Sequence, residues 1–403
     1  MGASAFKKIG VVSHILPPSP SGQSMVLHRL LSGLASTSYC LISSGRKHDA
    51  GDAACERLDA PYFYLPKVRQ LPPVAIPGLS ALFVCINLLW VVLRRSRQIE
   101  DMARREGCEA IVACTGDFYD LPAAFLACRR MKIPFVPYIF DDYGYQWLGF
   151  RRSIAKRLER VLLSFAAAVI VPNEYLQREY ATRHGIDSTV IHNPCSLPDL
   201  ERLDQGPKMF GEGVNIVYTG SIYHAHYDAF ANLIAALRLL GRPEVKLHLF
   251  TAQSERELAG QGIGGPQVVH HPHVPQREVE RILRQADLLF LPLAFRSPIP
   301  EVIRTSAPGK MGEYLAVGRP VLVHALPDSF IAWYFRANGC GIVVDQHDAG
   351  VLSQAIEALL SDPQALTDMG LKARKRAQVD FDVTVVRSQF LALLKRIGFR
   401  CGA

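Results

Sequence analysis

One run of the sequence, residues 297–325, limits the possible folds more than any other. It starts as a polar loop with three prolines, takes helical spacing over 310–316, and ends in the apolar run 321–325. Gly318 and Pro320 separate the helix from the apolar run, because neither residue favours a helix interior. A loop that opens a short helix, followed by a buried strand, predicts an α/β fold with a parallel sheet.

The same run carries side chains that suit a phosphate and a sugar. A helix N-terminus exposes unpaired N–H groups and partial positive charge, which attract an anion. Ser306 and Lys310 add a hydroxyl and a cation near this end, and Glu313 falls on the same helix face as Lys310. We therefore expect Lys310 to bind a phosphate and Glu313 to bind sugar hydroxyls. An ordinary crossover helix with a solvated Lys–Glu pair would show the same pattern.

Short apolar runs alternate with helical segments along the whole chain. Strands are predicted in the first half over residues 8–13, 39–43, 110–114, 134–140, 167–171 and 189–192. They are predicted in the second half over residues 215–218, 246–251, 268–274, 288–292 and 341–344. This alternation indicates doubly wound α/β domains, and 403 residues suffice for two of them. Residues 196–212 hold few apolar side chains and predict the linker between the domains.

Acidic residues follow two strands of the first half. Asp117 and Asp120 come after the strand at 110–114, and Asp141 and Asp142 come after the next one. Open α/β sheets bind ligands at the carboxyl ends of their strands, so these carboxylates are candidates for a reaction centre. Each of them is also explained as a helix N-cap or a loop carboxylate.

The first loop holds Gly22 but lacks the G-x-G-x-x-G pattern, so a dinucleotide-binding fingerprint is absent. Gly22 has two explanations of equal weight. It either lets the backbone approach a ligand or permits a tight turn with positive φ.

Charge and cysteine content exclude some classes of function. The formal charge of +8 is uneven, with 23 Lys and Arg against 17 Asp and Glu in residues 1–200 and 22 against 20 in the rest. No basic patch with interleaved aromatic residues occurs, so we expect no nucleic acid partner.

The nine cysteines form no C-x-x-C pair, which is typical of reduced thiols. Lys7 and Lys8 precede an apolar run of only strand length, so we expect no signal peptide and a cytoplasmic location.

Residues 79–93 are the most apolar segment, and Arg94, Arg95 and Arg97 follow directly. The segment is shorter than the ~20 residues that an untilted transmembrane helix needs. A core helix is the favoured interpretation. The other is a helix in a membrane interface, with the arginines on anionic head groups, so that the protein is peripheral on the inner membrane face.

Residues 307–321, APGKMGEYLAVGRPV, resemble the C-terminal signature of GT-B glycosyltransferases, especially the retaining family four (glycosyl transferases group 1). Members often carry P-S-K-x-x-E-Y-L-A-x-G-x-P-V, and Gly309 replaces the serine here. The runs VPNEYL at 171–176 and ADLLFLP at 286–292 also resemble family motifs. The resemblance covers nearly the whole chain.

This resemblance implies an α/β GT-B fold, in which two Rossmann-like domains face each other across a cleft. The expected parts are an N-terminal acceptor domain over 1–195, a linker over 196–212 and a C-terminal nucleotide-sugar domain over 213–380. A C-terminal helix over 381–403 could pack back on the first domain. The implied reaction moves a sugar from a nucleoside diphosphate sugar to a hydroxyl acceptor, with retention. The acceptor would be a glycan, a lipid-linked molecule or a small molecule.

The resemblance also implies a role for each candidate residue. The catalytic candidates are Asp117, Asp141 and Lys310. On the acceptor side, Gly22 would lie close to the substrate. On the donor side, the expected contacts are Gly220 and Ser221 at the phosphates, His273 and Val274 near the nucleobase, Arg304, Ser306 and Lys310 at the diphosphate, and Glu313 on the ribose.

Departures from the family pattern leave alternatives open. Thr305 stands where many members have a glutamate that contacts the donor sugar, and the loop after Gly220 lacks the usual Arg and Lys. A UDP-sugar 2-epimerase, an inverting transferase with Asp117 as base, and a non-catalytic nucleotide-sugar-binding homologue are the alternatives. Neither a metal nor a cofactor is expected, because the histidines at 270, 271 and 273 have no evident carboxylate partner.

Overall fold

The computed structural model describes residues 7–45, 55–72, 76–204 and 208–399. The chain divides into two compact units. Unit 1 comprises residues 1–192 and 386–403, and unit 2 comprises residues 193–385. Each unit is a parallel-sheet α/β domain, which confirms the predicted fold class.

Unit 1 is built on a seven-stranded sheet with the order β3-β2-β1-β4-β5-β6-β7, in which all paired strands are parallel. The strands are β1 Ile9–Val12, β2 Tyr39–Ser43, β3 Tyr62–Tyr64, β4 Ala110–Cys114, β5 Phe135–Tyr138, β6 Ile170–Val171 and β7 Thr189–Val190. The order doubles back at β1, so the loops after β1 and β4 meet at one edge of the sheet.

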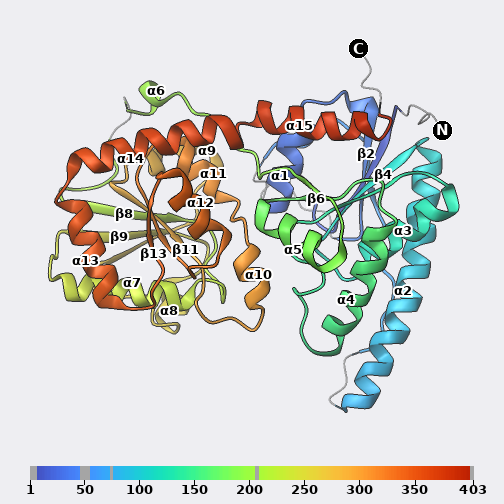
Figure 1. Ribbon diagram of the computed structural model, residues 1–403, viewed down its shortest axis with the longest axis horizontal. Helices are drawn as coiled ribbons and strands as arrows, with labels where there is room; N and C mark the ends of the chain where they lie inside the picture. Colours follow the sequence, from blue (N-terminus) through green and yellow to red (C-terminus); the bar gives the residue numbers. More distant parts are fainter. Residues whose placement is uncertain (1–6, 46–54, 73–75, 205–207, 400–403) are drawn as a thin grey trace. The chain divides into compact units, whose positions relative to one another are not determined.

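Helices cover both faces of this sheet (Figure 1). They are α1 Gly22–Leu31, α2 Pro77–Arg105, α3 Asp120–Met131, α4 Gly149–Ser164, α5 Glu174–His184 and α15 Val383–Arg396. Alternate residues of β4 show the two layers. Ile111 packs with residues of α2, α3 and α4, whereas Val112 packs with residues of α1 and α15. Because both faces are covered, the strands are apolar throughout.

The C-terminal segment of α15 belongs to unit 1. Phe390 and Leu394 are buried against Leu27 and Leu30 of α1. The Arg387 guanidinium donates to the backbone oxygen of Arg29, which lies in the last turn of α1. Burial of this apolar face holds α15 against α1 and one face of the first sheet.

Unit 2 carries a six-stranded parallel sheet with the order β10-β9-β8-β11-β12-β13. Its strands are β8 Val214–Thr219, β9 Val245–Phe250, β10 Val268–His271, β11 Leu288–Pro292, β12 Val321–His324 and β13 Ile342–Val344. Its helices are α6 Leu200–Asp204, α7 Tyr227–Leu240, α8 Glu255–Ala259, α9 Gln276–Arg284, α10 Pro300–Thr305, α11 Lys310–Ala316, α12 Phe330–Asn338, α13 Ala349–Leu360 and α14 Pro363–Arg376.

Two expectations about unit 2 are wrong in detail. The region before Lys310 is not all loop, because Pro300 sits at the first position of helix α10, where its missing N–H costs nothing. Strand β10 ends at His271, so His273 and Val274 lie in the loop that follows. The expected linker contains α6, a short helix.

The apolar segment at 79–93 is part of a much longer helix than predicted, since α2 continues through the arginines to Arg105. Among the described residues it alone is long and apolar enough to cross a membrane, and 22% of its most apolar window is buried. Its position in unit 1 places the C-terminal half in the core, where Ile99 and Ala103 are fully buried.

Candidate functional site

The loop after β8 and the start of α11 meet at the carboxyl edge of the second sheet. Gly220, the residue after β8, has φ +112, a conformation that L side chains rarely adopt. A Cβ atom at this position would lie 3.2 Å from the Nζ atom of Lys310. The fold therefore brings Gly220 and Lys310 together, and the glycine keeps the space beside the ammonium open.

The Lys310 ammonium lies against the aromatic ring of Tyr218 and is attracted by the carboxylate of Glu313. Its Nζ atom donates to the Oη atom of Tyr218 over 2.5 Å and lies 3.8 Å from the centre of the same ring. Burial lowers the pKa of Lys310 to about 7, and the carboxylate of Glu313 opposes that shift. A half-buried cation of this kind attracts an arriving anion more strongly than a fully solvated one, because water screens its charge less.

Glu313, one turn along α11, contacts the neighbouring helix. The Nε2 atom of Gln276 donates to its Oε1 atom over 3.0 Å. Gln276 is the first residue of α9, and His273 and Val274 immediately precede that helix. The predicted ribose residue and the predicted nucleobase loop thus lie at the same edge of unit 2.

A second polar group gathers at the carboxyl edge of the first sheet. Arg95 of α2 reaches into it and forms ion pairs of 2.6 Å with Asp117 and 2.7 Å with Asp120. Asp117 also accepts from the backbone N–H groups of Tyr119 and Asp120. It therefore caps the start of α3, which is one of the structural roles weighed for it in the sequence, and it also pairs with Arg95.

His14 joins this group through Ser44. The Ser44 hydroxyl donates to Oδ2 of Asp120 over 3.1 Å, which leaves its oxygen to accept from Nδ1 of His14 at 3.2 Å. In the tautomer that donates from Nδ1 to Ser44, Nε2 presents its lone pair. Burial raises the pKa of Asp120 to about 7, with Asp117 adding to the shift and Arg95 opposing it.

Two families of known proteins match this chain in sequence. The profile of the family described as Glycosyltransferase Family 4 matches residues 20–197, and that of Glycosyl transferases group 1 matches residues 213–362. Together they cover the second sheet, all of the first sheet except β1, and every residue discussed in this subsection except His14. The chain is a GT-B glycosyltransferase.

Solved structures share the fold of this glycosyltransferase at low sequence identity. Anabaena Alr3699/HepE in complex with UDP-glucose has a TM-score of 0.70 at 15% identity, over 96% of this chain and 99% of that one. A glycosyltransferase from Rickettsia africae ESF-5 has 0.69 at 14%, over 97% and 99%. The sucrose-phosphate synthase of Thermosynechococcus elongatus has 0.67 at 15%, over 97% and 99%. No curated protein matches the chain in sequence.

The structure also gives the positions and contacts of the remaining donor-side candidates of the glycosyltransferase. Arg304, in the last turn of α10, forms a 3.3 Å ion pair with Asp328 and is 40% exposed, so a compensating acid already faces it. Ser306 ends α10, four residues before Lys310. Ser221 is exposed directly after Gly220, and its backbone oxygen accepts from Tyr218. Thr305 is buried, and its hydroxyl donates to the backbone oxygen of Glu301 in its own helix.

Two acceptor-side expectations change. Gly22 is the first residue of α1, and its φ angle is not positive. A Cβ atom there would meet nothing within 4 Å, so no tight turn requires a glycine at this position. Arg95 is only 8% exposed and pairs with Asp117 and Asp120, so it does not reach head groups as the alternative interpretation of a membrane-interface helix required. Asp141 is exposed in the loop that follows β5 and stays a candidate.

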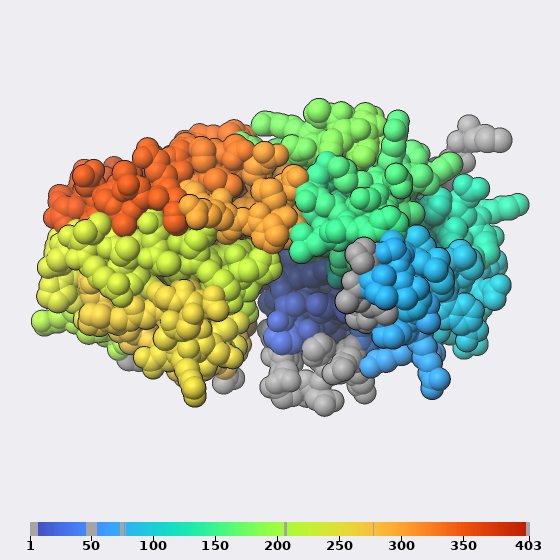
Figure 2. Space-filling view, turned by 90° about the horizontal axis from the view of Figure 1, so that it is seen from below, coloured from blue at the N-terminus to red at the C-terminus, as the bar shows by residue number. Residues whose placement is uncertain are grey.

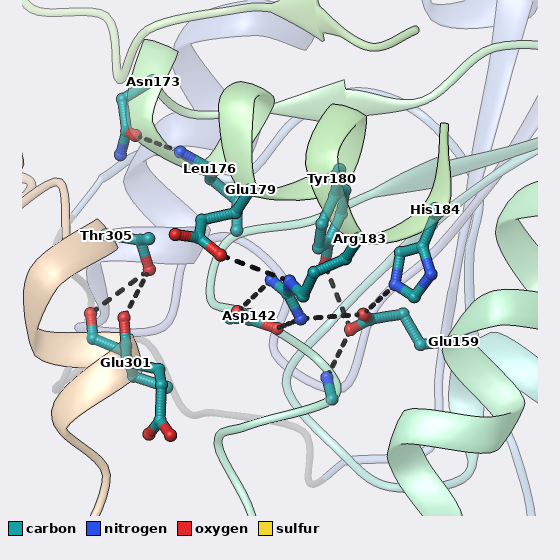
Figure 3. Close-up of polar contacts among 12 residues, drawn as sticks. Asp142, Glu159, Asn173, Leu176, Glu179, Tyr180, Arg183, His184, Glu301 and Thr305 are labelled. Atoms are coloured by element: carbon teal, nitrogen blue, oxygen red, sulfur yellow. Dashed lines mark hydrogen bonds and ion pairs between the residues drawn. The ribbon is translucent and has the colours of Figure 1, made fainter. Parts of the chain in front are cut away.

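Asp142, beside Asp141, lies in a buried ionic cluster (Figure 3). Arg183 of α5 contacts it at 2.5 Å and also contacts Glu159 of α4 at 3.2 Å. His184 contacts the same glutamate at 2.7 Å. Burial raises the pKa of Asp142 to about 8, with Glu159 adding to the shift and Arg183 opposing it. These contacts link α4 and α5 to the loop after β5, so the cluster stabilises the fold of unit 1.

Sequence reasoning missed His14 as a site residue. The signal was present, because His14 follows β1 at the same sheet edge as Asp117. His14, Asp117 and Asp120 lie close enough to be examined as a metal site. The Arg95 guanidinium pairs with both carboxylates at 2.6 and 2.7 Å and so takes the place that a cation would have, which makes these residues a poor fit for a resident metal.

Proposed function

We propose that this glycosyltransferase transfers a sugar from a nucleoside diphosphate sugar to a hydroxyl acceptor, with retention at the anomeric carbon. The observation that carries the proposal is the meeting of Lys310 with Gly220 at the carboxyl edge of the second sheet. The UDP and UDP-glucose complexes of the Anabaena protein make UDP the first nucleotide to test.

Lys310 would stabilise the departing diphosphate, which is the main catalytic demand of such a transfer. Gly220 and Ser221 would let the loop backbone approach the phosphates. Glu313 would bind the ribose, and the loop with His273 and Val274 would contact the base. We propose that no metal is needed, since Lys310 supplies the positive charge.

Inversion is the second candidate, and one observation favours it. The chain of contacts from Asp120 through Ser44 to His14 presents the lone pair of Nε2. A hydroxyl acceptor placed there would lose its proton to His14, with Asp120 and Ser44 as positioning residues. Asp117 is a poorer base, because it caps α3 and pairs with Arg95.

Two measurements test the proposal. Calorimetry with UDP should show binding to the wild type and much weaker binding to Lys310→Ala, whereas Lys372→Ala, an exposed lysine of the same unit, should behave as wild type. Proton NMR of the reaction with UDP-glucose and an alcohol acceptor then gives the product configuration. An α-linked product means retention, and a β-linked one with His14→Ala inactive means inversion. Absence of binding to any nucleoside diphosphate would refute both.

A further inference from the structure

Helix α2 has one face that unit 1 leaves uncovered. Large apolar side chains recur on it at steps of three or four residues, so they line up along one side. We call this row the apolar stripe, and its members are Leu79, Leu82, Ile86, Leu89, Trp90 and Leu93. Each is between 37% and 65% exposed. In Figure 2 the light blue atoms of this segment lie at the surface of the unit.

The opposite face of α2 is firmly seated in unit 1. Val91 is fully buried with residues of α3 and β4, and the Asn87 amide donates to and accepts from the backbone of Leu71. The favoured interpretation of a core helix thus holds for this face alone. The exposure of the stripe is a property of the folded unit and needs no unfolding of α2.

A groove continues the stripe toward α4. Its volume is about 330 Å³, and it lies between α2, α3 and α4. Leu89 belongs to both the stripe and the groove, and apolar side chains such as Phe125, Leu158 and Val161 line the rest. An apolar surface of this extent on a folded domain marks an interaction site.

Exposed basic residues follow the stripe on α2 and occur on α4, a helix that lines the groove. No charged residue occurs from 77 to 93, and exposed Arg94 and Arg97 follow, with Arg94 5.5 Å from the ring of Trp90. On α4 the exposed charged residues are all basic: Arg151, Lys156, Arg157 and Arg160. The single acid of that helix, Glu159, is buried in the cluster with Arg183.

We propose that the apolar stripe and the groove dock this protein on an anionic lipid bilayer. Apolar side chains that enter the acyl boundary, with arginines at head-group level, fit an interfacial helix. A second copy of the chain fits less well, because a two-fold contact would bring the same basic residues of both copies together. The proposal does not depend on sugar transfer, since it concerns only the stripe, the groove and their rim.

Vesicle flotation tests the docking. The wild type should float at low salt with vesicles of phosphatidylglycerol and phosphatidylcholine, and far less with phosphatidylcholine alone. Leu82→Glu/Leu89→Glu should abolish flotation. The matched control is Leu239→Glu/Leu371→Glu, which places the same charges at leucines that are each 66% exposed outside the stripe and should leave flotation unchanged.

The arginines contribute separately. Arg94→Gln/Arg97→Gln should weaken binding to phosphatidylglycerol vesicles roughly 30-fold, at about 1 kcal/mol for each basic residue near the surface. Circular dichroism should show the same fold for every variant, because all six substituted positions are exposed. No flotation of the wild type at low salt would overturn the proposal. So would light scattering that shows a dimer which the stripe variant converts to a monomer.

Discussion

The Nζ atom of Lys310 and the Oη atom of Tyr218 lie 2.5 Å apart, although 92 positions separate the two residues in sequence. Tyr218 lies in β8 and Lys310 begins α11, so the contact exists only because the parallel sheet brings both elements to one edge. Burial leaves this ammonium with a pKa of about 7, so roughly half of it is charged at neutral pH.

Proton uptake on nucleotide binding is the first prediction. A diphosphate beside Lys310 stabilises its charged form, so the pKa should rise from about 7 and binding should take up a proton. Affinity for UDP should fall about fivefold between pH 7 and pH 8, because the free lysine loses its proton over that range. Calorimetry at pH 8 in buffers of different ionisation enthalpy measures the uptake. Lys310→Met should remove it, and uptake that persists in this variant would place the titrating group elsewhere.

The second prediction concerns Glu313. A carboxylate that accepts hydrogen bonds from ribose hydroxyls contributes roughly 1.5–3 kcal/mol. Glu313→Gln should therefore weaken UDP binding about tenfold or more, and thermal unfolding should change little. Gln276→Ala serves as the control, since it removes the protein partner of Glu313 and leaves the carboxylate in place. Unchanged affinity in Glu313→Gln would remove this residue from the nucleotide site.

The third prediction concerns the buried ion pairs of Arg95. Arg95→Met leaves Asp117 and Asp120 without their cation, and loss of one partner of a buried pair costs roughly 3–5 kcal/mol. Urea unfolding at pH 7.5 measures this loss. Arg104→Met is the matched control on the same helix, because its pair with Glu100 is exposed and is worth about 0.5 kcal/mol or less. Equal losses in the two variants would contradict the structural role of Arg95.

The fourth prediction is the pH dependence of the stability of unit 1. Folding raises the pKa of Asp120 from 3.8 to about 7, so the folded state binds more protons than the unfolded state between these values. Its contribution to stability is complete below pH 4 and is lost as the pH rises through 7. The unfolding temperature should therefore fall between pH 5 and pH 8. Asp120→Asn, which cannot titrate, should flatten that slope, and an unchanged slope would assign it to other groups such as Asp142.

The sequence by itself determined the architecture. The strands at 39–43, 110–114 and 288–292 and the helix at 310–316 have the predicted bounds, because continuous apolar runs and turn residues mark buried elements locally. The same patterns missed α10 and the β3 strand, and they ended α2 at its arginines. Short elements and the polar end of an amphipathic helix carry weak periodic signals, so neighbours in the fold decide them.

Only the tertiary structure decided which side chains share a site. The sequence placed Gly220, Lys310 and Glu313 near ligand-binding edges, but their contacts with each other and with Tyr218 and Gln276 depend on strand order. It also could not show that Arg95 turns inward while Arg94 stays exposed. Adjacent residues on a helix point about 100° apart, so one enters the core and the next faces solvent according to how the helix packs.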